Sequence, residues 1–345
     1  MIEAPRAAHP HPSRRRRART VVLAVVGVVL ASALMLAGFY AWRVWSTASE
    51  IRRDDTLLPS PDAVDPERPA PAATLTGSFN YVLMGSDVNP DGGEGRSDVL
   101  MLAHVPPARD KVYVISFPRD MWVQIPGHGM GEINAAFAHG GPALTTRTLE
   151  ALVGVRMDHA VRIDYDGFVG LTTELGGVTV DNRVESTKQG ASAVYHWPAG
   201  PVTLQGEEAL NYVRQRHGLP QGDLDRAERQ RAMVRAILGK LMSRDVLADP
   251  ARFATVMGAL GKHVTVDAGL TNDALFAAAS SMRVTSSADI VLLQAPLSGF
   301  GRSADGQSID VVNTRQLAEM RDAIRDGRMA EYAAAHRNQP LVGNR

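Results

Sequence analysis

The sequence predicts a layered α-β-α domain with a central mixed β-sheet, preceded by one N-terminal transmembrane helix. Two features predict this arrangement, one for the transmembrane helix and one for the α/β domain. A charge-free apolar run covers residues 20–42, and beyond a proline-rich stretch short apolar runs alternate with segments of helical periodicity. Alternating strands and helices are typical of α/β layers. With 45% hydrophobic and 21% charged residues, the composition is that of a folded chain.

The apolar run is long enough to cross a bilayer, because about 20 apolar residues span the hydrocarbon core. The arginine-rich residues 14–19 precede it and favour a cytoplasmic N-terminus. We therefore expect a cytoplasmic basic tail over 1–19, an uncleaved signal-anchor helix over 20–45, and a single-pass cell-membrane protein whose later residues are extracellular. The competing interpretation is a cleaved signal peptide, since Ala31-Ser32-Ala33 resembles a cleavage site.

Composition also narrows the chemistry. The 37 basic and 37 acidic side chains cancel, so no chain-wide field attracts nucleic acid. Cysteine is absent, which excludes disulfides, thiolate zinc sites and thiol nucleophiles. The histidines do not form a His-Glu-x-x-His motif, and no Gly-x-Ser-x-Gly elbow is present. Reactive groups are therefore expected among carboxylates and guanidinium groups.

After the anchor, the composition indicates a linker, a folded domain and a C-terminal tail. Residues 46–76 contain a run of prolines from Pro59 to Pro71, which is typical of an extended linker. We expect one folded domain over 77–328 and a C-terminal tail over 329–345.

Three short apolar runs, 79–84, 99–105 and 112–117, predict the first strands of this domain. The connection over 106–111 is too short for a crossover helix, so the second and third strands should form an antiparallel hairpin. The end of the third strand then lies beside the start of the second. If the first strand ends at the same edge, acidic and basic side chains converge there: Asp87, Arg96, Asp98, Arg119 and Asp120.

The following residues alternate between helix and strand. The pattern predicts helices over 133–138, 142–152 and 168–175, and strands over 161–163 and 178–180. Asn134, at the entry of the first helix, is a candidate ligand or simply a helix-entry residue.

A second charged cluster begins at Tyr212. An extended segment would place Arg214 and Arg216 on one face. Asp225 to Glu228 fits a capping box, and the helix it starts carries Arg226 and Gln230 in line with its apolar stripe. A helix N-terminus with an arginine favours a phosphate ligand.

Each signal has a structural alternative. Arg214 and Arg216 could be a solvated strand edge, and Asp87 and Asp98 a turn residue and a strand-start cap. Arg119 and Asp120 could form a weak surface ion pair.

Taken in order, the motifs resemble the LytR-CpsA-Psr family of bacterial cell-envelope proteins. The motifs are Leu83-Met84-Gly85-Ser86-Asp87, Gly95-Arg96-Ser97-Asp98, Ile115-Ser116-Phe117-Pro118-Arg119-Asp120, Ile133-Asn134-Ala135-Ala136-Phe137, Tyr212-Val213-Arg214-Gln215-Arg216 and the segment Gly222 to Gln230.

The resemblance implies a phosphotransferase that moves a glycopolymer from a polyprenyl-diphosphate carrier in the membrane lipid to peptidoglycan. It implies that Asp87 and Asp98 hold Mg²⁺. The catalytic set it implies is Asp87, Arg96, Asp98, Arg214, Arg216 and Arg226, and the substrate-binding set is Arg119, Asp120, Asn134 and Gln230. An apolar slot for the isoprenoid is expected near Phe137, Phe168 and Leu171, which would serve equally well as core residues.

Two departures from the family pattern stand out. Glu132 occupies a position where many relatives have lysine, and Val88-Asn89-Pro90 follows Asp87 in place of a nearby arginine. Two other functions stay open from sequence alone. One is hydrolysis of the polyprenyl diphosphate, and the other is a non-catalytic envelope regulator that binds the lipid diphosphate.

Overall fold

The structure, a computed structural model, describes residues 35–43, 45–46, 50–60, 68–69, 77–86, 97–191, 193–241, 243–284 and 286–336. The chain divides into two units, Met1–Ser46 and Thr47–Arg345. Residues 35–43 and 45–46 of the first unit are helical. The basic tail and residues 20–34 of the expected transmembrane segment lie outside the described residues. Among the helices that the structure does describe, none combines the length and the apolar character needed to cross a bilayer.

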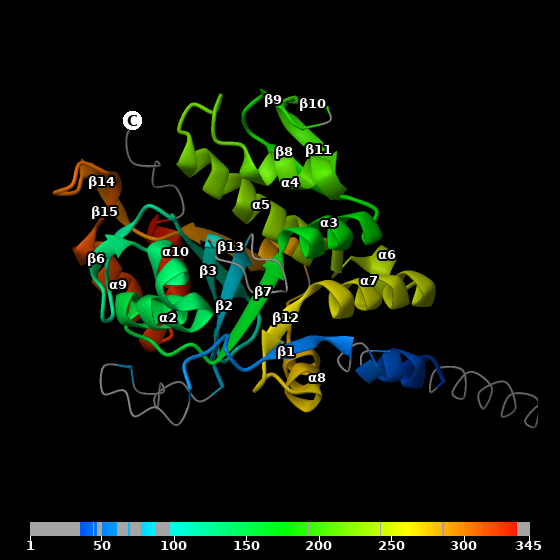
Figure 1. Cartoon of the computed structure of the whole chain (residues 1–345). Coiled ribbons are helices and arrows are strands. Elements are labelled where there is room, and N and C mark those ends of the chain that lie inside the picture. The colour runs from blue at the N-terminus through cyan, green and yellow to red at the C-terminus, as the bar shows by residue number, and fades with distance from the viewer. Residues whose placement is uncertain are drawn as a thin grey trace, which may run out of the picture. The chain divides into compact units, whose positions relative to one another are not determined.

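The second unit contains a seven-stranded sheet with the order β1-β12-β7-β2-β3-β4-β13 (Figure 1). The sheet is mixed, as expected: β2 runs antiparallel to β3 and parallel to β7, and β4 runs antiparallel to β3 and parallel to β13. Its strands are β1 (Arg52–Asp54), β2 (Phe79–Ser86), β3 (Ser97–Val105), β4 (Val112–Phe117), β7 (His159–Asp164), β12 (Thr265–Asp267) and β13 (Ile290–Gln294).

Four two-stranded sheets accompany the central one. They pair β5 (Trp122–Ile125) with β6 (Gly129–Glu132), β8 (Val178–Asn182) with β11 (Gly200–Leu204), β9 (Ser186–Gln189) with β10 (Val194–Trp197), and β14 (Leu297–Arg302) with β15 (Ser308–Val312).

The helices are α2 (Ala135–Val153), α3 (Tyr165–Glu174), α4 (Gly206–Arg214), α5 (Asp223–Leu241), α6 (Arg244–Leu247), α7 (Pro250–His263), α8 (Asn272–Ser281), α9 (Thr314–Arg325) and α10 (Met329–His336), with a 3-10 turn η1 at Ser287–Asp289. The two helices expected over 133–138 and 142–152 are confirmed, because α2 consists of two helical segments separated by a break. Gly140 and Gly141 have non-helical backbone angles just before Pro142.

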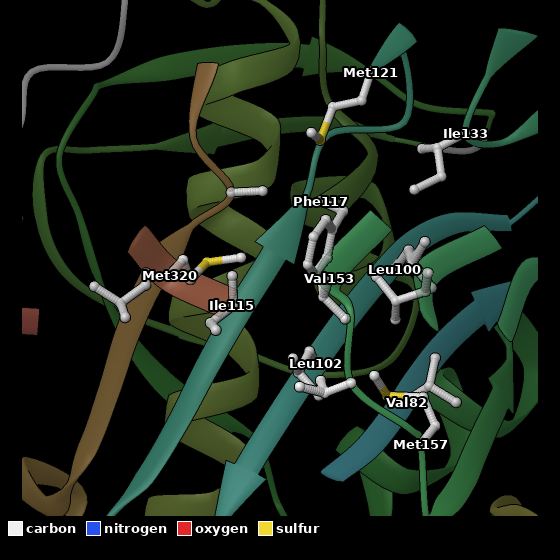
Figure 2. Packing of buried hydrophobic residues seen from close by; sticks show 14 of the residues in the cluster. Val82, Leu100, Leu102, Ile115, Phe117, Met121, Ile133, Val153, Met157 and Met320 are labelled. Carbon is white, nitrogen blue, oxygen red and sulfur yellow. The ribbon is translucent and has the colours of Figure 1, made fainter. Parts of the chain in front are cut away.

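The main hydrophobic core lies on one face of the sheet. Alternate residues of neighbouring strands, such as Leu100, Leu102, Ile115 and Phe117, point to this face and are buried there (Figure 2). Helices α2, α9 and α10 cover them, and in Figure 1 these helices group on one side of the sheet. The layered α/β architecture is thereby confirmed.

The opposite face carries the other set of alternating residues. Met101, Ala103, Val114 and Ile290 form a smaller cluster against α5. Partly buried apolar side chains surround it: Tyr81, Leu83, Val99, Val112, Val234, Leu238 and Leu292.

Two of the three residues named for the isoprenoid slot, Phe137 and Leu171, are buried side chains. Phe137 belongs to the main core, whereas Leu171 is buried in α3 and takes no part in that core. Phe137 is therefore a packing residue of α2.

The domain starts earlier than the expected boundary at residue 77. Within the segment expected to be a linker, β1 pairs in parallel with β12 at the sheet edge, and Leu57 is fully buried in the main core. Arg68 forms a two-pronged contact with the buried carboxylate of Glu150, at 2.7 and 2.8 Å. The partners of these residues lie far away in sequence, which local composition does not reveal.

The expected tail also begins as part of the domain. Met329, Tyr332 and Ala333 of α10 are buried in the main core, so the folded domain extends at least to His336. Residues 337–345 lie outside the described part of the chain.

We predict that Leu57→Ala lowers the free energy of unfolding by about 2–5 kcal/mol, because it leaves a cavity in a packed core. Urea unfolding of the full chain measures this. Met130→Ala is the matched control, since Met130 is 52% exposed and its truncation should cost under about 0.5 kcal/mol. Equal effects of the two substitutions would contradict the placement of Leu57 in the core.

Candidate active site

The charged rim forms where β3 begins and β4 ends. Leu100 is paired with Phe117, so Asp98 and Arg119, two residues beyond each, come together. Arg119 Nη1 donates to Asp98 Oδ1 at 3.1 Å. The predicted convergence of these two residues is confirmed.

A neighbouring strand adds a tyrosine to the rim. β7 runs parallel to β2 and ends at Asp164, which caps α3 by accepting a hydrogen bond from Gly167 N at 2.6 Å. The cap fixes Tyr165 as the first residue of α3, and its hydroxyl donates to Asp98 Oδ2 at 2.5 Å. Asp98 is thus held from two sides.

Two predicted residues of the rim cannot be placed. Asp87 directly follows Ser86, the last residue of β2, and Arg96 directly precedes Ser97, the first residue of β3, but both lie outside the described residues. Their roles stay predictions.

The segment with Arg214 and Arg216 is not extended, contrary to the sequence-based expectation. Residues 206–214 form α4, so Arg214 ends a helix and Arg216 lies in the loop after it, just before the turn at His217 and Gly218. The segment is helical and not extended because a helix buries Leu210 and Val213 on one apolar face. Both arginines nevertheless reach the site, and the guanidinium of Arg214 lies over the Tyr165 ring at 4.4 Å.

Helix α5 also begins two residues before the expected capping box. Gly222 has φ +54°, a left-handed conformation that favours glycine, and the helix starts at Asp223. Asp225 Oδ2 instead accepts from Gln221 N at 2.7 Å. The earlier start places Asp223 one helical turn before Arg226.

Asp223 is the centre of the arginine cluster. This carboxylate, with a side chain only 3% exposed, lies 2.7 Å from Arg216 Nε, 3.0 Å from Arg226 Nη2 and 3.6 Å from Arg119 Nε. Sequence reasoning missed it because an acidic residue in the first turn of a helix is typical of capping. The signal available was its i,i+3 spacing to Arg226.

Burial and neighbouring charges shift the pKa values of side chains in the cluster. Burial raises the pKa of Asp98, but the Tyr165 hydrogen bond and the Arg226 and Arg119 charges outweigh it, so the pKa lies below its ordinary value. Burial and the neighbouring Asp223 raise the pKa of Asp120 to about 6. Burial lowers the pKa of Arg226, although Asp223 opposes this. Asp98 is therefore ionised at neutral pH.

A cavity of about 620 Å³ lies beside this cluster. The predicted residues around it are Asp98, Arg119, Arg214, Arg216, Arg226 and Gln230. The unpredicted residues are Thr187, Lys188, Gln189, Gln215, His217 and Gly218. Residues from distant parts of the sequence thus surround one space large enough for a small ligand.

Two further predicted residues sit behind the cavity wall. Asp120 is 5% exposed and accepts from Arg119 Nε at 3.1 Å, so it supports that arginine and does not line the cavity. Asn134, just before α2, donates its backbone N–H to Arg119 O at 3.2 Å and is likewise not among the lining residues that the structure describes.

The described residues contain no group of three or more histidine or acidic side chains that could hold a metal by themselves. Asp98 is the ionised carboxylate among the described cavity-lining residues. Carboxylate oxygens are the ligands Mg²⁺ prefers, and this ion usually uses one or two of them together with water and substrate phosphates.

Comparison with known proteins identifies the family. Residues 44–326 match the LytR_cpsA_psr family. The chain belongs to this family. The LytR_cpsA_psr match spans both charged clusters and the strand β1, so the early domain start agrees with the family boundaries.

Relatives of this LytR_cpsA_psr protein include named enzymes. It is 31% identical over 251 residues to the polyisoprenyl-teichoic acid–peptidoglycan teichoic acid transferase TagU of Enterococcus faecalis, covering 72% of this chain and 79% of TagU. The crystal structure of Bacillus subtilis TagV superposes with a TM-score of 0.63 at 25% identity, over 73% of this chain and 97% of TagV. The structure of TagT bound to LIIa-WTA superposes with a TM-score of 0.55 at 26% identity, over 77% of this chain and 94% of the TagT chain.

We predict that Asp223→Asn lowers the free energy of unfolding by about 3–5 kcal/mol, because buried guanidinium groups lose their counter-charge. Urea unfolding provides the measurement. Asp249→Asn removes the same charge from an exposed pair with Arg252 and keeps the helix cap, so it should cost under about 1 kcal/mol. A loss at Asp223 no larger than at Asp249 would show that the cluster does not depend on this carboxylate.

A second prediction concerns pH. Because the folded chain holds the Asp120 proton up to about pH 6, ionisation of Asp120 destabilises the fold as pH rises from about 4 through 6. Asp120→Asn removes this cost. The stability of the variant relative to the wild type should therefore increase between about pH 4.5 and about pH 7.5 in urea unfolding. A difference that is constant with pH, or that shrinks, would contradict the raised pKa.

Proposed function

We propose that the protein is a magnesium-dependent phosphotransferase that attaches a glycopolymer from a polyprenyl-diphosphate carrier to peptidoglycan during cell-wall assembly. The observation that carries the proposal is a cavity that the ionised Asp98 lines together with Arg119, Arg214, Arg216 and Arg226. Arginine forks match phosphate oxygens in geometry and charge. The names of the transferase relatives support the same reaction class.

The proposed reaction exchanges the phosphoanhydride bond of the diphosphate for a phosphodiester bond to peptidoglycan. The oxygen of a peptidoglycan hydroxyl forms a bond to the phosphorus that carries the glycan, and the bond from that phosphorus to the bridging oxygen breaks. Polyprenyl monophosphate leaves with the bridging oxygen, and the hydroxyl proton passes to solvent or to this phosphate. Water in place of the sugar hydroxyl would give hydrolysis.

The arginine cluster suits this chemistry because phosphoryl transfer is accelerated mainly by positioning and by stabilising charge on non-bridging and leaving oxygens. Asp223 fixes Arg216, Arg226 and Arg119 before the substrate arrives, so little reorganisation is needed during reaction. Gln230 Nε2 donates to Val213 O at 3.3 Å, which holds this amide at the cavity wall.

Asp98 fits the requirement for a magnesium ligand. It is ionised, reaches the cavity and is oriented by Tyr165 and Arg119. We propose that Asp98, together with Asp87, holds Mg²⁺, which would offset charge on the diphosphate oxygens.

The lipid of the donor requires an apolar surface. The partly buried side chains between the sheet and α5, including Leu83, Leu292 and Val234, offer one, and we propose that the isoprenoid lies there. An N-terminal membrane anchor with an extracellular domain would bring this surface to the carrier lipid.

The test is transfer of a synthetic polyprenyl-diphosphate-linked glycan to peptidoglycan by the full chain in detergent. We expect a covalent glycan–peptidoglycan product with Mg²⁺ and little product after chelation with EDTA. Arg226→Ala and Asp98→Asn should each lower the rate by roughly 100-fold or more, since each removes a charge at the reacting group.

Arg315→Ala is the control, because Arg315 is an exposed residue of α9 with a 92% accessible side chain and should leave the rate unchanged. Absence of product from the wild-type chain, or equal rates for all variants, would overturn the proposal. Release of free glycan phosphate without a covalent product would identify a hydrolase instead.

A further inference from the structure

The cavity contains cations of two kinds. Arg119, Arg216 and Arg226 are each paired with Asp223. Arg214 and Lys188 line the same cavity, but no carboxylate of the described residues forms an ion pair with either of them. Lys188 Nζ donates only to a neutral acceptor in the described part of the chain, the backbone oxygen of Asn211 at 3.3 Å.

Lys188 and Arg214, which have no carboxylate partner among the described residues, interact unfavourably. Burial lowers the pKa of Lys188, and the charge of Arg214 lowers it further. Like charges that share a partly desolvated cavity repel, and an anion between them removes the repulsion. An anionic ligand would thus stabilise both side chains.

The strand that carries Lys188 is held against the cavity by buried groups. Arg229 donates to Ser186 Oγ at 2.7 Å and to Gln215 Oε1 at 2.6 Å, and Gln215 Nε2 donates to Thr187 O at 3.1 Å. β9 is thereby tied to the turn that follows Arg214. This connection fixes the position of Lys188 relative to Arg214.

We propose that Lys188 and Arg214 form an anion subsite, separate from the Asp223-centred cluster, that takes the second phosphate of a lipid diphosphate. The inference rests on the proposed function for the identity of the ligand. Thr187 and Gln189, the neighbours of Lys188 in β9, are also among the residues that line the cavity.

The experiment measures binding of geranylgeranyl diphosphate, geranylgeranyl monophosphate and inorganic pyrophosphate to the full chain in detergent. Lys188→Met should weaken diphosphate and pyrophosphate binding by roughly 10-fold to 100-fold, as expected for a lost charged hydrogen bond, and monophosphate binding much less. Lys188→Arg should retain the preference for diphosphate. Lys262→Met is the control, since Lys262 is 61% exposed and pairs with Glu174. Thermal unfolding midpoints no lower than that of the wild-type chain would verify that the variants fold.

The outcomes separate the subsite from the proposed function. If the wild-type chain binds the lipid diphosphate and Lys188→Met keeps the same preference for diphosphate over monophosphate, the subsite is overturned. The phosphotransferase proposal then stays intact. If pyrophosphate binds in a way that depends on Lys188 but neither lipid binds, the subsite is supported. The proposal that the donor is a lipid diphosphate is then overturned. Failure of the wild-type chain to bind any of the three overturns both.

Discussion

The structure of the site depends on one buried carboxylate. Asp223 brings together guanidinium groups from the end of β4, the turn after α4 and the first turn of α5, three segments that would otherwise repel one another. Because this counter-charge belongs to the protein, the arginines can be packed at the sheet edge in the absence of ligand. The cost is that the cluster carries less net positive charge than its arginine count suggests.

Because Asp223 partly neutralises the arginines of the cluster, cations outside the cluster contribute much of the positive charge in the cavity. The proposed diphosphate ligand would meet arginines in the cavity that are already partly neutralised by Asp223 and Asp120. No carboxylate of the described residues pairs with Arg214, which is stacked on Tyr165, or with Lys188 on β9. Under the proposed function, the Asp223-centred arginines would orient the ligand, and Arg214 and Lys188 would add electrostatic attraction.

Much of the fold and part of the site could be predicted from the sequence. Apolar runs bounded by turns gave β2, β3 and β4, and the short connection between β3 and β4 implied the antiparallel pairing that brings Asp98 to Arg119. The family, predicted from ordered motifs, is confirmed. These features depend on local periodicity and on the length of one loop, which the sequence shows directly.

What the sequence did not reveal depends on distant contacts. The spacing of Arg214 and Arg216 resembles an extended strand, but the buried apolar face of α4 makes the segment helical through Arg214. Asp223 has the pattern of a helix-cap residue, and its three arginine partners are apparent only after folding. Lys188 lies on a four-residue polar strand, and its place at the cavity depends on the buried Arg229.

The parallel pairing of β1 with β12 has a practical consequence. A recombinant fragment starting after the proline-rich stretch, near Gly77, would lack both the outermost strand β1 and the core residue Leu57. The uncovered backbone of β12 would then present free N–H and C=O groups to other molecules, a known route to self-association. Fragments intended for crystallisation or soluble assays should begin before residue 50.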